Sequence, residues 1–562
     1  MPDSSTIPAR LRAQLTATDI TVIDSGTTIL SGIDLTVTPK SRWAVVGENG
    51  RGKSTLLHVL AGKLTPDVGT VSRVGTLGLA EQEMPTTDEC TVGQVVRDSI
   101  ADALAALDEF EIASNRLASG TAEADHRYST ALEQVEALDA WNAERRVNIA
   151  LGGLGAVTER SRLLTELSVG QRHRVRLACL LGSDHDFLLL DEPTNHLDRE
   201  GVNYLTEQLR SRAGGVVVVS HDRALISDVA QHILDLDPTR DGRPRIYGDG
   251  YAGYRAGRES EQTRWEQDSE QQKTKTARLL EDLTNAQNRL VSGWRPGKGT
   301  GKHQRATRSG GLAKNVHRRQ EALESKLLPV PEPLQRFRLP ELQTRPGASL
   351  LTVQEVTVEG RLHVPTTLSL RGRAKQVVTG PNGSGKSTLL SILAGELHPT
   401  TGRRHTAEGL RVALLRQETT LPLQCKVGEH FRSYTDTLVS DGALSAGAVV
   451  SLSSIGLLRP HEMSKRIGEL SIGQQRRLDL ALTLARRPHV LLLDEPTNHL
   501  SIRLVDELTE ALDATEAAVV VSTHDRQMIR DTNSWRTLVL SCDPDGLNAC
   551  PAVGILPFDH LR

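Results

Sequence analysis

The stretch Gly47-Glu-Asn-Gly-Arg-Gly-Lys53-Ser54 returns later in this chain as Gly380-Pro-Asn-Gly-Ser-Gly-Lys386-Ser387. Each copy follows an apolar run and precedes leucines at helical spacing, which predicts a strand, a glycine turn and a helix. In such a turn the backbone N–H groups curl around phosphate oxygens, the lysine adds a positive charge and the serine hydroxyl can bind Mg²⁺. The sequence therefore predicts two phosphate-binding cradles, made of Gly47, Glu48, Asn49, Gly50, Arg51, Gly52, Lys53, Ser54 and Thr55, and of Gly380, Pro381, Asn382, Gly383, Ser384, Gly385, Lys386, Ser387 and Thr388.

Three more motifs recur in the same order. Leu167–Gln171, Leu189–Leu197 and Ser220–Arg223 each return 303 residues later, whereas the two cradle lysines are 333 residues apart. The first copy therefore carries about 30 extra residues after its cradle, and the chain is predicted to contain two copies of one domain.

Short continuous apolar runs surround these motifs. Such runs are typical of central strands in a parallel sheet that is covered on both faces. The fold class is therefore predicted to be α/β, with strands at Arg42–Val46, Phe187–Leu190, Val216–Val219, Lys375–Thr379, Val490–Leu493 and Val519–Val521.

Composition excludes several classes of protein. The chain has 562 residues, which indicates several domains, and its 67 basic and 70 acidic residues give a net charge of −3. Any nucleic-acid site must therefore be local rather than a global basic field. No apolar run is long enough to cross a membrane, no signal peptide is recognised, and the five scattered cysteines have no metal-ligand spacing, so we expect a cytoplasmic protein with reduced thiols.

Acidic residues and histidines follow the predicted strands at the same positions in both copies. Asp191 and Asp494 end apolar strands, where a carboxylate can reach Mg²⁺, and the glutamates that follow can polarise an attacking water. A histidine stands 29 residues after each glutamate, which favours a contact with the terminal phosphate. The predicted catalytic residues are Glu192, Glu495, His221 and His524, and the predicted Mg²⁺ ligands are Ser54, Gln82, Asp191, Ser387, Gln417 and Asp494.

Together, the Leu-Ser-x-Gly-Gln motifs and the paired cradles resemble the ATP-binding cassette superfamily, and Asp-Glu-Pro-Thr-Asn-His-Leu in both copies resembles its ABC-F branch. The resemblance covers nearly the whole chain. It implies a cytosolic ATPase that binds ribosomes, with two tandem cassettes that face each other head to tail around two ATP molecules. Each ATP would be shared between the cradle of one cassette and the signature residues of the other, which are Ser168, Gly170 and Gln171 in the first copy and Ser471, Gly473 and Gln474 in the second. Ser168 and Ser471 are also predicted to cap the helices that follow them.

Two departures from the family pattern lead to expectations. No aromatic residue that could stack on adenine is found around Ile23–Gly26 or Val358–Arg361, so GTP is expected as a possible second substrate. Ser501 stands where the first copy has Asp198, so the two ATP sites are expected to turn over unequally.

Two segments do not belong to the cassette pattern. The region of about 95–150 lies inside the first domain (14–257) and is predicted to form a helical arm of two helices broken at Ser119-Gly120. Its 11 acidic and 5 basic residues disfavour RNA and favour a basic ribosomal protein, the alternative being a solvated hairpin.

The second segment, 258–340, is predicted to be a helical linker to the second domain (341–562), with helices at Thr263–Leu290 and Leu312–Leu327. Leu283–Gln320 holds nine Lys or Arg residues, two His and no acid. This local charge predicts phosphate binding. The alternative is a solvated flexible linker, a role that a neutral segment would serve equally well. The predicted RNA-binding residues are Trp294, Arg295, Lys298, Lys302, His303, Arg305 and Arg308.

These observations lead to one functional expectation with two alternatives. By resemblance, the protein is a monomer with intramolecular cassette pairing. Its ATP-bound form inserts the linker toward the P-site tRNA and the peptidyl-transferase centre, contacts large-subunit rRNA, displaces a bound antibiotic, and leaves after hydrolysis. A housekeeping factor for stalled ribosomes and the ATPase subunit of an exporter are the alternatives. The acid-free basic linker argues against the exporter, because a membrane partner offers it no phosphates.

Overall fold

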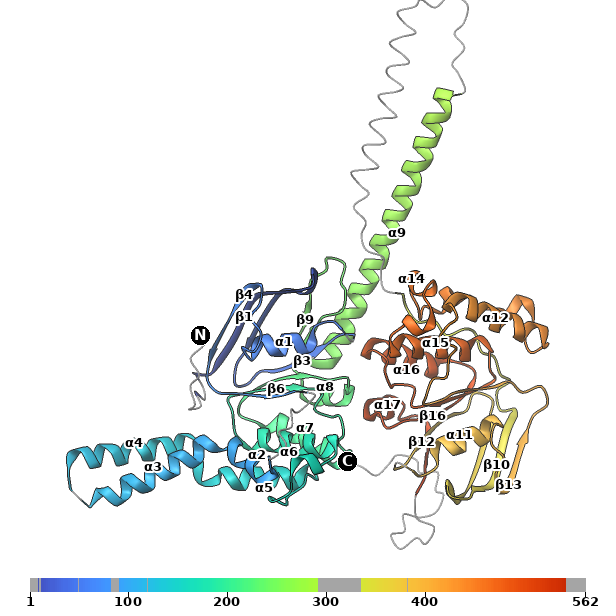
Figure 1. Ribbon diagram of the computed structural model, residues 1–562. Coiled ribbons are helices and arrows are strands. Elements are labelled where there is room, and N and C mark those ends of the chain that lie inside the picture. The colour runs from blue at the N-terminus through green and yellow to red at the C-terminus, as the bar shows by residue number, and fades with distance from the viewer. Residues whose placement is uncertain are drawn as a thin grey trace, which may run out of the picture.

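The computed structural model describes residues 9, 12–48, 50–81, 90–118, 120–291, 335–381 and 383–541. Two lobes of similar architecture stand side by side, and one long helix rises from the junction between them (Figure 1). This arrangement confirms the predicted fold class of two tandem α/β cassettes.

The first cassette combines an antiparallel sheet with a mostly parallel one. Three strands form the antiparallel sheet in the order β2-β1-β4, and six form the second sheet in the order β5-β6-β7-β3-β8-β9. The strands are β1 (Gln14–Asp24), β2 (Thr27–Val37), β3 (Arg42–Val46), β4 (Val68–Val74), β5 (Leu77–Ala80), β6 (Phe187–Asp191), β7 (Gly215–Val219), β8 (His232–Asp235) and β9 (Arg245–Tyr247).

The antiparallel sheet and one helix cover one face of the larger sheet and other helices cover its second face, so its central strands β3, β6 and β7 are buried throughout. The helices are α1 (Lys53–Leu60), α2 (Val92–Ser99), α3 (Ala101–Leu117), α4 (Ala122–Ala137), α5 (Ala143–Gly153), α6 (Val169–Gly182), α7 (Arg199–Ser211) and α8 (Arg223–Val229). This burial on both sides is the reason why the strands appear in the sequence as continuous apolar runs.

The second cassette repeats the arrangement with the sheet orders β11-β10-β13 and β14-β15-β16-β12-β17. Its strands are β10 (Ser349–Val358), β11 (Leu362–Arg371), β12 (Lys375–Thr379), β13 (Thr401–Thr406), β14 (Val412–Leu415), β15 (Val490–Asp494), β16 (Ala518–Ser522) and β17 (Arg536–Val539). Its helices are α11 (Lys386–Ala394), α12 (Val427–Ser440), α13 (Leu452–Ile455), α14 (Pro460–Met463), α15 (Ile472–Ala485), α16 (Ile502–Ala514) and α17 (Arg526–Asp531).

The predicted arm region contains α3 and α4, which lie antiparallel and project away from the second cassette (Figure 1). Phe110 packs against Tyr128 and Trp141 with ring centroids 5.3 and 6.0 Å apart, which joins the two helices to the segment after α4. The break between the helices falls at Ala118–Thr121, at the predicted Ser119-Gly120.

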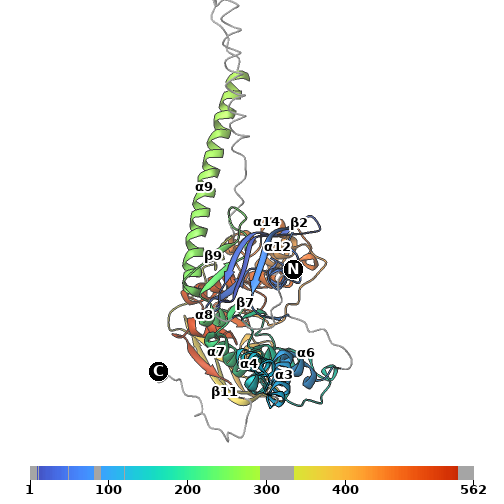
Figure 2. The ribbon, with the colours of Figure 1, turned by 90° about the vertical axis from the view of Figure 1, so that its left-hand side faces the viewer.

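The linker begins as a single helix, α9 (Gly250–Val291), which is 42 residues long and therefore spans about 60 Å. Figure 2 shows it leaving the two cassettes as a straight rod. It starts before the predicted helical stretch at Thr263, because Tyr251 and Tyr254 are buried against the cassettes and hold its first turns. The second predicted helix, 312–327, and all seven predicted RNA-binding residues lie outside the described residues.

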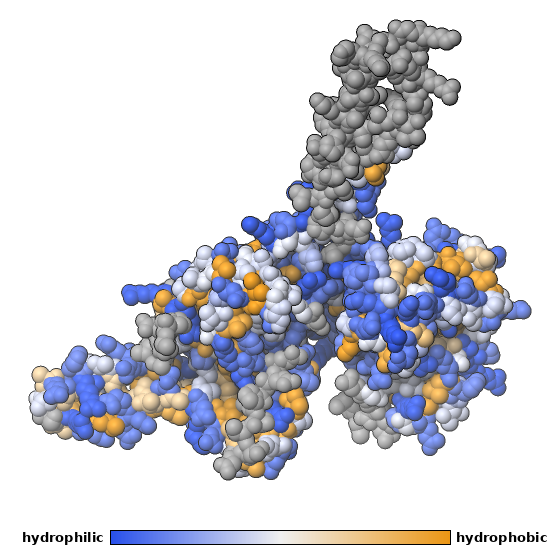
Figure 3. Space-filling view, turned by 45° about the horizontal axis from the view of Figure 1, so that its top comes forward, coloured by the Kyte–Doolittle hydropathy of each residue, from blue (hydrophilic) through white to orange (hydrophobic). Residues whose placement is uncertain are grey.

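Two properties of the described surface bear on possible partners. On the face seen in Figure 3, apolar side chains are scattered in small groups over both cassettes and the arm. Within the described ranges, the helices include none that is both long and apolar enough to cross a membrane.

Each cassette contributes an arginine that contacts residues of the other cassette at their junction. Arg223 at the start of α8 is only 1% exposed, and its guanidinium binds Asp525 at 3.1 Å and Asp506 at 2.5 Å in the second cassette. In return Arg526, its counterpart in the repeat, donates to Asn203 at 3.0 Å and lies 3.5 Å from Asp222 of the first cassette. Arg223 and Arg526 occupy equivalent positions of the repeat, so the two cassettes contact each other reciprocally.

The helix that follows each Asn-His-Leu motif begins differently in the two cassettes. Asp198 caps α7 by accepting the Gly201 N–H at 2.8 Å, whereas Ser501 makes no side-chain cap on α16. We expect Asp198→Ala to destabilise the first cassette by about 1 kcal/mol and Ser501→Ala to change stability far less. Urea unfolding midpoints of the two variants provide the measurement, and equal shifts would contradict the assigned caps.

Candidate nucleotide sites

Each cradle connects a buried strand to a helix and requires glycine on structural grounds. Gly52 and Gly385 have φ angles of 84° and 91°, in the left-handed region that disfavours other residues. A Cβ atom on Gly52 would lie 2.6 Å from a methyl group of Ile29, and one on Gly385 would lie 2.7 Å from the Arg361 carbonyl oxygen. Asn49 and Asn382 lie outside the described residues.

The cradle lysines are buried and held inside their own loops. Lys53 Nζ donates to the carbonyl oxygens of Gly47 at 2.7 Å and Glu48 at 3.2 Å. Lys386 Nζ makes the same contacts with Gly380 at 2.9 Å and Pro381 at 3.0 Å. Burial lowers the pKa of Lys53, although the nearby carboxylates of Glu192, Asp237 and Asp191 act in the opposite direction. Ser54 and Ser387, one residue on, are exposed at the helix N-termini, where a phosphate-bound cation can reach them.

The acidic residues and histidines of each copy form a closely similar cluster. Glu192 Oε1 lies 3.4 Å from His221 Nε2, and Glu495 Oε1 lies 3.5 Å from His524 Nε2. The other carboxylate oxygen of each glutamate accepts the backbone N–H of the same histidine at 3.2 Å. We call the first cluster nucleotide site 1, which consists of Lys53, Asp191, Glu192 and His221. The second cluster is nucleotide site 2, which consists of Lys386, Asp494, Glu495 and His524.

Burial controls the protonation of these groups. It raises the pKa of Glu192 to about 7 and that of Glu495 to about 7, which are values suited to a general base near neutral pH. It lowers the pKa of His221 to about 4 and also lowers that of His524, so both imidazoles are neutral at pH 7 and can hydrogen-bond a phosphate without carrying charge.

Three buried carboxylate oxygens in these clusters make no hydrogen bond. They are Glu192 Oε1, Glu495 Oε1 and Asp494 Oδ1. A buried polar atom without a partner is costly unless a ligand satisfies it, and a carboxylate oxygen is a preferred ligand of Mg²⁺ or of a water bound to it. The residues present therefore fit a Mg²⁺–nucleotide complex.

The glutamates have an unusual backbone. Glu192 and Glu495 have φ angles of 46° and 45°, and His196 and His499 have 64° and 63°. The left-handed turn after each strand places the carboxylate next to the histidine instead of letting the strand continue. Such a conformation costs a non-glycine residue roughly 1–2 kcal/mol.

The predicted helix caps at the signature motifs are confirmed. Ser168 Oγ accepts the Gln171 N–H at 3.3 Å and Ser471 Oγ accepts the Gln474 N–H at 3.3 Å, while each glutamine side chain accepts the serine N–H in return. A Cβ on Gly473 would lie 2.6 Å from the His499 carbonyl oxygen, which explains the glycine.

One contact connects a signature helix to the opposite cradle. Arg477, in α15 just after the second signature, lies 3.3 Å from Glu48 in the first cradle. The second cassette has Pro381 at the position of Glu48, and the first has Arg174 at the position of Arg477. The position equivalent to Glu48 in the second cradle therefore offers Arg174 no carboxylate.

Other predicted site residues are placed less fully. Gln417 is exposed just after β14, and Gln82 lies outside the described residues. Near the expected adenine position, Ile23 is 48% exposed at the end of β1, so an aliphatic side chain is available there in place of an aromatic one.

Sequence reasoning missed a buried arginine that supports nucleotide site 2. Arg476 Nη2 donates to the backbone oxygens of Asp494 at 3.0 Å and Glu495 at 3.2 Å. The first copy has His173 at this position, and burial lowers the pKa of that imidazole. This difference between the repeats was visible in the sequence, but its contacts were not.

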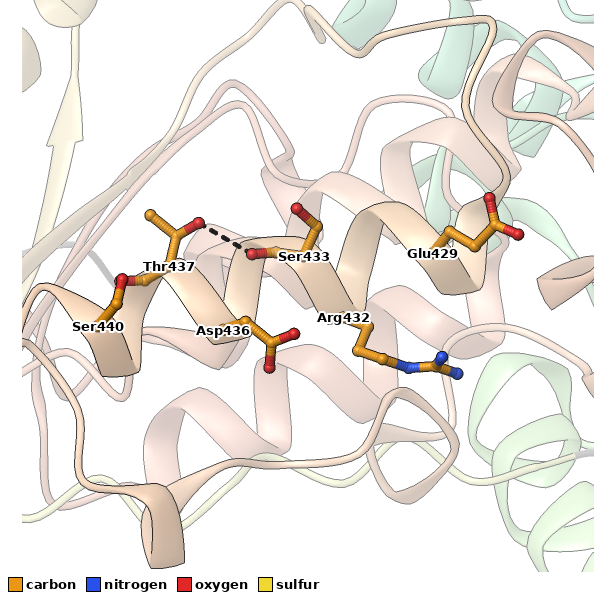
Figure 4. A pocket seen from close by; sticks show the side chains of 6 residues that line it. All are labelled: Glu429, Arg432, Ser433, Asp436, Thr437 and Ser440. Carbon is orange, nitrogen blue, oxygen red and sulfur yellow. Dashed lines mark hydrogen bonds between the residues drawn. The ribbon is translucent and has the colours of Figure 1, made fainter.

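A shallow hollow elsewhere lacks the features of a site. Glu429, Arg432, Ser433, Asp436, Thr437 and Ser440 line it, all from α12 (Figure 4). Thr437 Oγ1 donates to the Ser433 carbonyl oxygen at 2.9 Å within the same helix. Among the residues that the structure describes, the hollow is lined by α12 alone, so it is not a candidate site.

The differences at Glu48 and Asp198 lead to a prediction about turnover. We expect Glu192→Gln and Glu495→Gln, made singly, to reduce steady-state ATP hydrolysis to different extents, because the two sites have different supports around similar catalytic groups. Phosphate-release rates of the two variants at saturating ATP give the comparison. Equal losses would remove the support for unequal sites.

Comparison with known proteins agrees with this geometry. Residues 30–195 and 365–498 match the family described as ABC transporter. The chain is 38% identical over 521 residues to the tylosin resistance ATP-binding protein TlrC of Streptomyces fradiae, with 89% of this chain and 92% of that protein covered. It is 31% identical over 520 residues to the energy-dependent translational throttle protein EttA of Mycobacterium tuberculosis, covering 90% of this chain and 87% of that protein.

Among solved structures, the archaeal ribosome recycling factor aABCE1, in complex with the stalk protein aP1, matches with a TM-score of 0.53. The match is 18% identical and covers 93% of this chain and 87% of that one, so it shows a shared twin-cassette fold and nothing more specific. The two ATP-binding cassettes in one chain and the full-length relatives together show that this chain belongs to the ABC-F family of ABC ATPases.

Proposed function

We propose that this protein protects ribosomes from an antibiotic through a cycle of ATP binding and hydrolysis in the cytoplasm. Bound ATP closes the cassettes of one monomer, and the linker enters the ribosome toward the P-site tRNA and the large-subunit rRNA. Hydrolysis to ADP and phosphate reopens the cassettes and releases the protein.

The side chains of each nucleotide site have separate roles in this proposal. Lys53 and Lys386 bind phosphate oxygens, and the neutral His221 and His524 hydrogen-bond the terminal phosphate. Glu192 and Glu495 accept a proton from the attacking water, for which a pKa of about 7 is suitable. Mg²⁺ would be held by the serine of the cradle, the Asp at the strand end and the Gln of each copy, and when bound it would neutralise phosphate charge.

Closure would be favoured because the phosphates of each ATP bind to both cassettes at once, which adds contacts to the ion pairs that already join them. Ser471 and Gly473 at the start of α15 would contact the ATP bound at site 1, and Ser168 and Gly170 would contact the ATP at site 2. The Arg477–Glu48 contact supports this pairing, because it already brings the second signature helix to the first cradle.

The single observation that carries the ribosome proposal is α9, a 42-residue helix that projects from the junction of the cassettes and leads into the basic, acid-free segment 283–320. A rod of this kind can deliver positive charge to RNA phosphates at a distance. The relatives are named for tylosin resistance and for translational throttling, which agrees with a target in the ribosome. The acidic arm would contact a basic ribosomal protein.

A housekeeping role in translation is the second candidate, favoured by the relative described as a translational throttle. Drug susceptibility separates the two roles. A sensitive host expressing this chain should survive higher concentrations of at least one ribosome-targeting drug in a panel that includes tylosin, whereas Lys53→Ala with Lys386→Ala should give no protection.

Ribosome and membrane fractions from the same cells test the exporter alternative. Co-sedimentation with ribosomes in the presence of ATP supports the proposal, and recovery with membranes contradicts it. Because Ile23 stands in place of an aromatic side chain, we propose that GTP is also hydrolysed. Phosphate release from GTP by the purified protein tests this base selectivity.

A further inference from the structure

The root of the linker helix is joined to the first phosphate cradle by a buried chain of charged groups. Asp237, two residues beyond β8, accepts the Glu48 backbone N–H at 2.7 Å through Oδ1. Its other oxygen, Oδ2, accepts from Arg258 Nη2 at 3.2 Å, and Arg258 belongs to the third turn of α9. One carboxylate therefore contacts both the cradle and the linker.

A second carboxylate fixes the same arginine. Arg258 Nη1 contacts Asp235 Oδ2, while Asp235 Oδ1 accepts the Asp237 backbone N–H at 2.9 Å. The arginine side chain is only 14% exposed and the two carboxylates less than that. Because a buried ion pair has defined geometry only when all of its partners are satisfied, this group resists sliding of α9 along the first cassette.

The opposite side of the same helix root is bound to the second cassette. Tyr251 OH donates to Asp506 Oδ2 at 2.7 Å, and the other oxygen of Asp506 accepts from Arg223. Arg255 contacts Glu510 of α16 as well. The first turns of α9 therefore lie between the two cassettes and cannot move without changing contacts to one or the other.

The second cradle cannot have the equivalent connection. The strand registers align Val46 with Asp235 and Thr379 with Val539, so valine replaces the first carboxylate and the exposed Ser541 replaces the second. Pro381 stands at the position of Glu48 and has no backbone N–H to donate. Within the described residues, the connection between linker and cradle is thus made at site 1 alone.

We propose that Asp237 and Arg258 are positioning residues that couple the root of the linker helix to the phosphate cradle of nucleotide site 1 and leave site 2 uncoupled. A displacement of α9 then changes the aim of the Glu48 N–H and the affinity for ATP at site 1. The inference rests on the proposed assignment of Lys53 and Lys386 to separate ATP sites.

The test measures ATP binding at one site at a time. Isothermal titration of the full-length chain carrying Lys386→Ala reports on site 1, and the chain carrying Lys53→Ala reports on site 2. Adding Asp237→Asn, which keeps an oxygen for the Glu48 N–H but removes the charge that holds Arg258, should weaken ATP binding at site 1 by about tenfold. Binding at site 2 should change less than about twofold.

Variants of the helix itself complete the test. Arg258→Gln should weaken site 1 although this residue touches no part of the cradle loop directly, and Arg258→Lys, which keeps the charge, should weaken it less. Arg264→Gln, an exposed arginine on the same helix, is the matched control and should leave both affinities unchanged. Circular dichroism melts identify any variant that fails to fold, and Asp237→Asn remains as the milder substitution.

The outcomes separate the two levels of inference. Equal weakening of both sites, or unchanged binding at site 1 in both Asp237→Asn and Arg258→Gln, would overturn the coupling. A stoichiometry of two ATP molecules in the Lys386→Ala chain would instead overturn the assignment of the sites on which it rests.

Discussion

The double variant Glu192→Gln with Glu495→Gln will bind ATP and lose hydrolysis by at least about 100-fold, since a positioned general base typically contributes two to four orders of magnitude. Glutamine keeps the size of the side chain and can still accept the backbone N–H of His221 or His524 at 3.2 Å, so the cluster should stay folded. The cradles, lysines and strand-end aspartates are untouched. The closed, ATP-bound state should therefore accumulate and the protein should remain on ribosomes.

Release of phosphate and sedimentation with ribosomes check this expectation on the same preparation. Lys53→Ala with Lys386→Ala is the control, because it should lose both hydrolysis and ATP-dependent sedimentation. Hydrolysis at the wild-type rate in the glutamine variant would show that Glu192 and Glu495 are not the bases.

Deletion of residues 294–308 should abolish ribosome-linked activity and any drug protection while basal ATP hydrolysis survives. These residues lie outside the described residues, and they contain none of the cassette motifs. Lys302→Glu with Arg305→Glu should weaken ribosome binding by on the order of tenfold or more and reduce its salt dependence, since each substitution turns attraction to phosphate into repulsion. Trp294 is expected to add base stacking of about 1–3 kcal/mol.

The measurements are pelleting with ribosomes across a salt series, in the Glu192→Gln with Glu495→Gln background, and a susceptibility assay. Lys273→Glu with Lys275→Glu makes the same charge change on the exposed surface of α9 and serves as the matched control. Normal binding and normal protection by the deletion variant would return segment 258–340 to the role of a plain spacer.

The parts of the fold that depend on local pattern could be predicted. The strands at Arg42–Val46 and Lys375–Thr379 have the predicted bounds, because a strand buried on both faces has a continuous apolar sequence. The caps at Ser168 and Ser471 follow from the same local rule, since a serine before a helix satisfies its free N–H groups.

The parts of the structure that depend on contacts between distant residues could not be predicted from the sequence. The sequence pattern predicts the start of α9 too late, at Thr263. The earlier turns are helical because Tyr251 and Tyr254 are buried against the cassettes, and helix periodicity does not show that burial. Arg223 belongs to the repeated motif Ser220–Arg223. Its partner Asp506 is 283 residues away, so the motif alone does not indicate the contact. Asp237 and Arg258 belong to no motif, and only the strand register shows that they meet the cradle.

The left-handed turn at Glu192 and Glu495 sets stability and catalysis against each other. Glycine would relax the backbone at both positions and remove a buried carboxylate whose pKa is already raised by desolvation. A selection for thermal stability alone would therefore favour replacing the two residues that we propose as the general bases. A library of variants of this protein that is screened only for folding should therefore be enriched in inactive ATPases. Engineering of a more stable variant has to keep glutamate at both positions.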